Sequence, residues 1–338
     1  MKYPSVAILI LHNNGEKILK NCLNSLKKTD YPNFKTFVLL YQSTDKSEEI
    51  IKKHKITYFK SDKNLGFAGG NNFLINKTKS DYIVFLNNDT EVDKNWLKEL
   101  IDFSEKNKIA ACQPKVLNLV NKSAFDYAGA SGGFIDKYGY PFCRGRIFNN
   151  LENDHGQYNA PKQIFWASGA CMLVKRKVLD KVGYFDESLF LYGEELDLCW
   201  RINNSGENLF VVPSAKIYHL GSYSVNAAKM NRKKQFLIQR NTFIVLIKNH
   251  FPSSMSRILK RLSLELISTF ESFSRALAVL KSLLWILFNL RKVITMRRNA
   301  QKTRRISEND LQHIIYPKSI AISYYLKGKS KFSQLTEF

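Results

Sequence analysis

The first group of residues that could take part in chemistry follows a short apolar segment, Tyr82–Leu86, which runs directly into Asn87, Asn88 and Asp89. Such a segment is typical of a strand buried on both faces of a mostly parallel sheet. A carboxylate at the end of that strand lies where open α/β sheets bind ligands. It could hold a divalent cation, which in turn could hold a diphosphate. The alternative is that these residues form a turn and cap a helix over residues 96–105.

The second group is acidic and lies at the start of another predicted helix. Glu194, Glu195 and Asp197 place three carboxyl groups within four residues. Acids in a first helical turn often do no more than complement the helix dipole. Crowded like charges also raise at least one pKa, which suits a general base. Arg201 follows Asp197 by four residues, on the same helix face, where it could pair with that acid or with a phosphate.

The third candidate is His219, which follows a strand predicted over Leu209–Val212 and closed by Pro213. Gly221 lies close by in the sequence. An imidazole at a strand end could bind a metal if that end faces the same crevice. A single histidine is more commonly a packed or surface residue, so both interpretations stay open.

The elements that must position these groups alternate between strands and helices, as in βαβ units with a parallel sheet. From residue 122 to residue 159 we expect long loops or a small antiparallel excursion over the site. Residues 164–175 are expected to form one strand, followed by a helix to Val182. The remaining expected strands are Val6–Leu11, Phe34–Leu40, Ile56–Phe59 and Tyr82–Leu86, and the remaining expected helices lie over 18–26, around Ile50, from residues 64–72 onward, over 96–105 and from Glu194 onward.

The positive charge of the chain is concentrated in its last third. The formal net charge is +23, and residues 229–338 hold 22 Lys and Arg but only 5 Asp and Glu. We therefore expect a domain over 1–228 and a basic, helical region over 229–338. Residues 277–296 resemble an amphipathic helix that lies in a membrane interface with basic flanks toward anionic headgroups. Their charge-free run, 282–290, is too short to span a bilayer. Alternatively, these helices only cover the main core.

The five cysteines are scattered and form no metal-binding pattern, so we expect reduced core residues in a cytosolic protein. The chain start has a very short apolar run with no small-residue cleavage site, and we expect it to be a first strand and not a signal peptide.

Taken in order, six motifs resemble the family 2 glycosyltransferases of the GT-A fold, particularly the rhamnosyltransferase-like branch of bacterial and archaeal surface polysaccharide assembly. The resemblance covers about residues 4–250, and the basic tail is similar to the C-terminal helices of that branch. The motifs are VAILILHNN near the N-terminus, NLGFAGGNN at 64–72, FLNNDTEVDKNWL at 85–97, ASGACMLVKR at 167–176, FLYGEELDLCWR at 190–201 and IYHLGSYS at 217–224.

The resemblance implies a Rossmann-like sheet flanked by helices and a metal-dependent, inverting transfer. It implies that Asp89 binds Mg²⁺ or Mn²⁺, that Asn87 stands at the place of the family's first Asp, and that His219 matches a metal-binding His. It implies that Glu195 is the base.

The remaining site residues also follow from the resemblance. Relatives usually end the second strand with an Asp that binds the nucleoside base, whereas this chain has Leu40 before Tyr41, whose ring could stack on the base. The implied donor-binding residues are His12, Asn13, Tyr41, Asn64, Gly66, Gly69, Asn72, Asn88 and Arg201. The implied acceptor-binding residues are Trp166, Gly169, Glu194 and Asp197.

The implied donor is a dTDP- or UDP-linked sugar, such as rhamnose, and the implied acceptor is a lipid-linked or polysaccharide hydroxyl in cell-surface glycan synthesis. An anionic membrane surface is the expected partner of the tail, which places the protein in the cytoplasm on the inner face of the cell membrane. Two alternatives stay open: a relative that binds sugar-nucleotide or glycan without turnover, and a basic nucleic-acid-binding protein, the latter not expected because the excess charge lies beside apolar helix faces. Gly66, Gly69 and Gly70 do not have dinucleotide-binding spacing.

Overall fold

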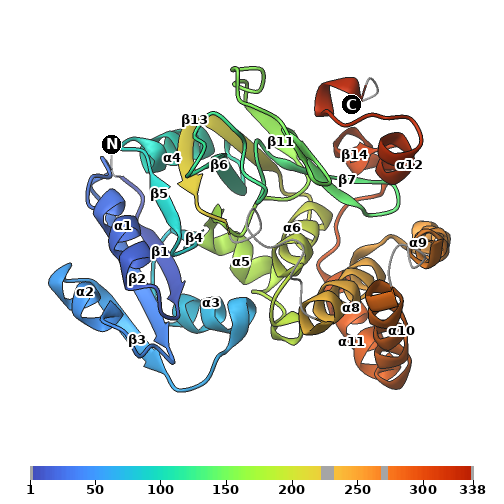
Figure 1. The fold of residues 1–338 in the computed structure, drawn as a ribbon, viewed down its shortest axis with the longest axis horizontal. Helices are drawn as coiled ribbons and strands as arrows, with labels where there is room; N and C mark the ends of the chain where they lie inside the picture. Colours follow the sequence, from blue (N-terminus) through green and yellow to red (C-terminus); the bar gives the residue numbers. More distant parts are fainter. Residues whose placement is uncertain (1–2, 222–231, 268–272, 336–338) are drawn as a thin grey trace.

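The computed structural model describes residues 3–221, 232–267 and 273–335. Its N-terminal part is a run of βα units, as the alternating pattern predicted (Figure 1). These units are β1 (Val6–His12), α1 (Glu16–Leu26), β2 (Phe34–Tyr41), α2 (Ser47–Lys53), β3 (Thr57–Ser61), α3 (Gly66–Asn76), β4 (Tyr82–Leu86), β5 (Thr90–Val92) and α4 (Trp96–Asn107).

The second part of the chain completes the main sheet and adds a small one. Its elements are β6 (Ala111–Asn118), β7 (Gly133–Asp136), β8 (Pro141–Cys143), β9 (Arg146–Ile147), β10 (Asn150–Leu151), β11 (Lys162–Ile164), β12 (Cys171–Lys175), α5 (Arg176–Val182), α6 (Glu194–Asn204) and β13 (Leu209–His219). The antiparallel excursion expected over 122–159 is therefore confirmed as β7 to β10. The single strand expected over 164–175 is wrong, because residues 165–170 turn between β11 and β12.

Within the described residues, the main sheet has nine strands in the order β11-β13-β6-β12-β4-β1-β2-β3, with β5 paired to β13. Six strands (β1, β2, β3, β4, β6 and β13) run in one direction, and β5, β11 and β12 run in the other. The expected α/β fold with a mostly parallel sheet is thus confirmed. Successive strand residues face opposite sides: Ile8 and Val84 pack into one buried cluster, whereas Leu9 and Phe85 pack into the other.

Two strands of the main sheet, β5 and β6, were missed because their sequences are short or polar. The residues after Asp89 do not lead straight into a helix: β5 comes first, and α4 starts only at Trp96, with Asn95 at its N-cap. The interpretation of Asn87–Thr90 as a cap for α4 is therefore wrong. The strand β6 contains polar residues that are buried because it lies between β12 and β13.

The end predicted for the strand at Leu209 is also wrong. The strand β13 continues beyond Pro213 to His219, and its pairing with β6 shifts between Val212 and Lys216. Proline has no N–H group to donate, so it is tolerated where a bulge interrupts the ladder. Because the strand continues, His219 pairs with Thr90 of β5 and comes beside Asp89.

The described part of the C-terminal region is mainly helical up to Lys302, and beyond this residue it also contains a short strand. The helix expected over 277–296 is broken at Asn289 into α10 (Phe273–Phe288) and α11 (Leu290–Lys302). Beyond α11 the chain returns to the small sheet, where β14 (Ile315–Tyr316) pairs in parallel with β7. None of the helices in the described part of the chain is both long and apolar enough to cross a membrane. The elements are α8 (Arg232–Asn249), α9 (Met255–Ile267), α10 (Phe273–Phe288), α11 (Leu290–Lys302), β14 (Ile315–Tyr316) and α12 (Ile320–Tyr325).

Candidate active site

The candidate site lies at one edge of the main sheet. Because β1, β2, β4, β6 and β13 run in the same direction, their carboxyl ends meet at this edge, where open α/β sheets bind ligands. The strand β12 runs the opposite way, so the residues before it come to the same edge. The N–H of Asn87, just beyond β4, donates to the carbonyl of Ala170 at 3.0 Å. The segment after β4 and the loop before β12 are therefore neighbours.

Asp89 and His219 meet at this edge as the metal hypothesis requires. Pairing of β5 with β13 brings them together, and the Leu220 N–H donates to the Asp89 carbonyl at 2.9 Å. The Asp89 Oδ1 atom lies 3.1 Å from His219 Nε2, and the Asn87 side-chain amide lies 3.3 Å from the same nitrogen. The Asp89 side chain is 23% exposed and that of His219 is 7% exposed, so the carboxylate is the more accessible group.

Asp126 orients this histidine, and no motif in the sequence pointed to this residue. His219 Nδ1 lies 2.9 Å from Asp126 Oδ1, and both side chains are buried. Burial by itself lowers the pKa of His219, but the hydrogen bonds and charges of Asp126 and Asp89 outweigh it and raise that pKa to about 10. With Nδ1 held by a carboxylate, Nε2 is the nitrogen presented toward Asp89, as in carboxylate–histidine–metal arrangements.

The residues at this position fit a divalent cation whose remaining ligands come from elsewhere. One carboxylate, one imidazole and one side-chain amide suit Mn²⁺ or Mg²⁺, and Asn87 would have to turn its amide oxygen toward the ion. Among the described residues, no group of three or more His, Cys, Asp or Glu side chains could hold a metal ion. Water and the phosphate oxygens of a substrate would therefore have to complete the coordination.

His12 and Asn88, both predicted to bind the donor, contact each other. The Asn88 side-chain amide lies 2.6 Å from His12 Nδ1, and His12 Nε2 lies 2.7 Å from the Ser47 hydroxyl. His12 is fully buried, and burial lowers its pKa to about 4 despite the opposing charge of Asp45. His12 is thus a neutral residue that positions Asn88, and the prediction that it contacts the donor is corrected.

The loop after β2 carries the residues expected near the nucleoside. The exposed Asn13 donates to the carbonyl of Tyr41 at 2.7 Å, which ties the end of β1 to the end of β2. Tyr41 is half-buried, and burial raises its pKa. Leu40 is buried in the core and presents no polar group. Asn64 is exposed and accepts from the N–H of Gly66 at 2.9 Å.

The glycines of α3 allow close packing against the loop before α6. Gly66 has a φ of +69°, and a Cβ there would lie 2.3 Å from the Phe190 carbonyl oxygen, which accepts from the Phe67 N–H at 2.9 Å. Gly69 is buried, and a Cβ there would lie 3.3 Å from the Leu65 side chain. These contacts place the start of α3 beside the segment that leads to Glu195.

Asn72 has a different role from the one predicted. Its amide nitrogen donates to the Phe185 carbonyl at 2.9 Å and to the Glu187 carboxylate at 3.0 Å, and its oxygen accepts from the Phe185 N–H. The side chain is 8% exposed. Asn72 therefore fixes the 185–187 segment, and the prediction that it lines the nucleotide pocket is corrected.

The acidic pair lies at the start of α6, after a strained turn. Phe190, Tyr192 and Gly193 all have positive φ angles. Glu194 is buried, and one of its carboxylate oxygens has no hydrogen-bond partner among the described residues. Burial raises the pKa of Glu194 well above its usual range, and the charge of Glu195 adds to that shift. Glu195 is half-buried, and burial raises its pKa as well.

Asp197 and Arg201 pair with each other, as one sequence interpretation allowed, but they do so inside the protein. Their contact is 3.0 Å, and the other Arg201 nitrogens donate to the carbonyls of Val182, Gly183 and Tyr184. Asp197 is fully buried, and although burial opposes it, Lys248 and Arg201 lower its pKa to about 2. The predictions that Asp197 lines the acceptor and that Arg201 binds the donor phosphate are corrected, because neither side chain is free to do so.

Helix α8 supplies supporting residues that sequence reasoning missed. Lys248 lies 2.6 Å from the Asp186 carboxylate and 2.9 Å from that of Asp197. The Asn241 amide donates to three carbonyls of the turn before α6, those of Leu189, Leu191 and Tyr192, at 2.7–2.9 Å. The basic region thus contributes directly to the positioning of the acidic pair.

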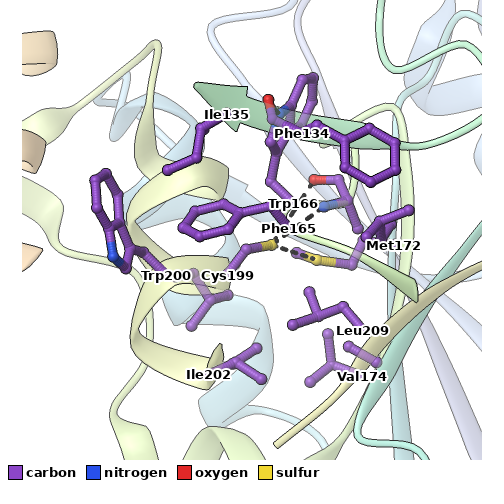
Figure 2. Close-up of a cluster of buried hydrophobic side chains, with 14 of the residues drawn as sticks. Phe134, Ile135, Phe165, Trp166, Met172, Val174, Cys199, Trp200, Ile202 and Leu209 are labelled. Carbon is purple, nitrogen blue, oxygen red and sulfur yellow. Dashed lines mark hydrogen bonds between the residues drawn. The ribbon is translucent and has the colours of Figure 1, made fainter. Parts of the chain in front are cut away.

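The loop before β12 joins the acidic helix to the metal-site side of the edge. Cys199, one helical turn after Glu195, accepts from the Ala167 N–H at 3.3 Å, and its sulfur lies 3.7 Å from that of Met172 (Figure 2). The Trp166 indole N–H donates to the Phe134 carbonyl at 2.9 Å, so this side chain is directed mostly toward the small sheet. Gly169 packs against Phe67, where a Cβ would lie at 3.3 Å.

Comparison with known proteins gives matches of one kind. The model of the family described as "Glycosyl transferase family 2" matches residues 6–183. The chain is 24% identical over 260 residues to the low-salt glycan biosynthesis hexosyltransferase Agl10 of Haloferax volcanii, covering 75% of this chain and 78% of that protein. It is 25% identical over 221 residues to the rhamnosyltransferase WbbL of Escherichia coli K12, covering 63% and 83%.

The fold agrees with these matches. The structure of GalNAc-T7 with UDP, GalNAc and Mn²⁺ superposes with a TM-score of 0.61 at 14% identity, over 86% of this chain and 58% of that one. Some relatives are much longer: the chain spans 18% of the O-antigen biosynthesis protein RfbC of Myxococcus xanthus, to which it is 24% identical over 233 residues.

Proposed function

This chain belongs to glycosyl transferase family 2 and has the GT-A fold, and from that premise we propose that it is an inverting, metal-dependent hexosyltransferase. One observation carries the proposal: a single sheet edge brings Asp89 and His219 into contact, and the loop at 166–170 connects that edge to the helix of Glu195. A cation ligand set and a candidate base are thus held by adjoining segments.

Glu195 is the proposed catalytic base. Its carboxylate takes the proton of an acceptor hydroxyl while that oxygen forms a bond to the anomeric carbon of the donor sugar. The bond from that carbon to the diphosphate oxygen breaks, the nucleoside diphosphate leaves with the bonding electron pair, and the configuration at the carbon inverts. A pKa raised by burial suits a base that must accept a proton near neutral pH. The charge of Glu195 adds to the effect of burial in raising the pKa of the neighbouring Glu194, so Glu194 tends to hold a proton while Glu195 carries the charge.

Asp89 and His219 are the proposed metal ligands, with Asn87 as a neutral third. When bound, Mg²⁺ or Mn²⁺ would neutralise the negative charge of the departing diphosphate. Asp126 holds His219 in the orientation that this requires, and Asn88, fixed by His12, lies next to the same carboxylate in the sequence. Asn13, Tyr41, Asn64, Gly66 and Gly69 are the proposed surroundings of the nucleotide.

The proposed donor is a dTDP- or UDP-linked sugar such as rhamnose, and the proposed acceptor is a lipid-linked or polysaccharide hydroxyl, bound near Trp166, Gly169 and Glu194. Support for the sugar comes from relatives named as rhamnosyltransferases, and support for a lipid-linked acceptor comes from the N-acetylglucosaminyl-diphospho-decaprenol L-rhamnosyltransferase of Mycobacterium tuberculosis, 33% identical over 89 residues. We place the reaction at the inner face of the cell membrane, in cell-surface glycan synthesis.

The test is substitution of the base in a donor-consumption assay with Mn²⁺. We expect Glu195→Gln to lower the turnover number by a hundredfold or more, because removal of a general base costs about 10²–10⁴ in rate. Binding of the nucleotide-sugar, followed by thermal shift, should remain. The control is Glu49→Gln on the exposed face of α2, which should leave turnover unchanged.

Two results would count against the proposal. Turnover of Glu195→Gln within a few-fold of wild type would end the assignment of the base. A wild-type protein that binds nucleotide-sugars but neither transfers nor hydrolyses them would instead be a binding relative without turnover.

A further inference from the structure

The helices after the main domain expose an unusual amount of apolar surface. Most of the large exposed apolar side chains of the described residues lie in α9, α10 and α11, and among them Phe273 is 80% exposed and Phe288 is 83% exposed. Such patches in a soluble chain mark an interaction surface. The exposed apolar residues of these helices are Met255, Leu259, Leu266, Ile267, Phe273, Leu280, Leu284, Leu287, Phe288, Leu290 and Ile294.

On α10 these residues form one stripe along the helix. Phe273, Leu280, Leu284 and Leu287 are separated by seven, four and three residues, so they lie on the same face. The opposite face packs on α8, where Ala278 and Ser282 are buried. Figure 1 shows α8, α10 and α11 lying side by side at the same end of the molecule.

A groove of about 560 Å³ opens between α8 and α10 beside this stripe. Its apolar lining includes Phe236, Leu277 and Trp285. Its charged lining consists of Arg232, Lys233 and Lys281, and none of these three cations has an ion-pair partner among the described residues. Among the described residues, no carboxylate lines the groove, so the charged side chains of this lining are all cationic.

The cations and the apolar stripe adjoin each other. Lys281 directly follows Leu280 of the stripe and precedes Trp285 of the groove by four residues, so it lies at the boundary between the two surfaces. An occupant must therefore combine an anionic group with apolar chains. A membrane lipid combines both groups. A nucleic acid has no aliphatic chains to contact the stripe, and it binds instead through exposed aromatic platforms.

We propose that the groove between α8 and α10 binds the phosphate of an anionic membrane phospholipid, with the acyl chains against the exposed stripe of α10. Arg232, Lys233 and Lys281 bind the phosphate, while the stripe enters the boundary between headgroups and acyl chains. The site is a local one, defined by these three side chains, and does not depend on the total charge of the protein.

Docking there would bring the acidic turn close to the membrane. Arg240 lies 5.0 Å from the ring of Trp285 in the groove and donates to the carbonyls of Ser188 and Leu189. Lys234, on the same helix, lies 5.3 Å from the ring of Tyr192. In this orientation Glu195 would face an acceptor held in the membrane, and this part of the inference rests on the proposed function. The binding of lipid to the groove does not depend on that function.

The test is flotation of the full chain with vesicles of phosphatidylcholine alone or with 30% phosphatidylglycerol. We expect binding to the anionic vesicles only. The double substitution Lys233→Glu and Lys281→Glu should weaken binding to the anionic vesicles at least tenfold. Each cation near an anionic surface raises the binding constant by a factor of about ten or less, and reversing its charge doubles the resulting change in binding free energy. The double substitution Lys27→Glu and Lys28→Glu at the exposed end of α1 alters the net charge equally and should weaken binding much less.

Three outcomes would overturn the proposal. The first is an equal loss of vesicle binding in both double variants, which would indicate general electrostatics, and the second is equal binding of the wild type to both vesicle types. The third is binding to RNA with a steep salt dependence and no binding to vesicles. Melting temperatures within a few degrees of wild type establish that the variants are folded. Donor hydrolysis in solution, measured on the same proteins, separates the two proposals, because it should be unchanged in both double variants if the groove only binds lipid.

Discussion

At the scale of single residues, Asp126 decides what His219 can do. A buried imidazole at a sheet edge could face Asp89 with either nitrogen, and the carboxylate of Asp126 on Nδ1 leaves Nε2 for the site. Asp126 is therefore a positioning residue of the proposed metal site. Residues that hold metal-binding histidines commonly affect metal affinity by 10- to 100-fold.

We predict that Asp126→Asn weakens Mn²⁺-dependent binding of UDP or dTDP by about 10- to 100-fold, because the neutral amide no longer holds the Nδ1 proton with a full charge. Isothermal titration calorimetry measures this nucleotide affinity directly and does not depend on enzymatic activity. Asp89→Ala provides the limiting case, in which the Mn²⁺-dependent part should vanish, and Asp62→Asn, on an exposed turn, provides the control. Unchanged Mn²⁺-dependent affinity in a folded Asp126→Asn protein would show that Asp126 has only a packing role.

At the scale of secondary structure, Asp136 fastens the C-terminal strand and helix to the small sheet. Its carboxylate accepts from the N–H groups of Tyr138, Tyr140 and Ile320 at 2.8–2.9 Å, and Ile320 begins α12. Burial raises the pKa of Asp136 to about 6, although the backbone N–H groups act in the opposite direction. The pKa is therefore higher in the folded chain than in the unfolded chain.

The sign of the resulting pH dependence follows directly. Between about pH 4 and pH 6 the folded chain binds more protons at Asp136 than the unfolded chain, so this group's contribution to stability is present below that range and is lost as the pH rises through it. The loss is at most about 3 kcal/mol, from about two pH units at 1.36 kcal/mol each.

We predict that Asp136→Asn removes this part of the pH dependence. Urea unfolding at pH 4.5 and pH 7 should show that wild type loses stability relative to the variant as the pH rises, and Asp62→Asn, on an exposed turn, should behave as wild type. If the free energies of unfolding of wild type and Asp136→Asn change in parallel with pH, Asp136 is not the source of this pH dependence.

At the scale of the whole molecule, the basic C-terminal region is part of the structure that supports the site. The boundary predicted at residue 228 lies outside the described residues, but α8 beyond it places Lys248 between Asp186 and Asp197. Removing one partner of such a buried charge cluster costs about 3–5 kcal/mol. The two predicted domains are therefore expected to depend on each other.

We predict that a fragment of residues 1–228 does not melt cooperatively, because it leaves Asp197 short of a cation and the turn before α6 without Asn241. A fragment of residues 1–302 keeps α8 to α11 and loses β14 and α12, so it should melt cooperatively at a lower temperature than the full chain. Calorimetry of the three proteins checks both statements. A 1–228 fragment that melts within a few degrees of the full chain would establish an independent domain.

The sequence alone determined the order of the βα units, the site edge at Asp89 and the start of α6 at Glu194, because hydrophobic periodicity and the residue types at strand ends are local properties. Only the tertiary structure decided that His219 pairs beside Asp89, since this depends on β5 and on a β13 that continues past Pro213. Likewise, local spacing placed Asp197 and Arg201 on one helix face, but packing of α8 decided that this face is buried. Asp126, Asn241 and Lys248 act across 49 to 93 residues of sequence, a range at which no local pattern carries information.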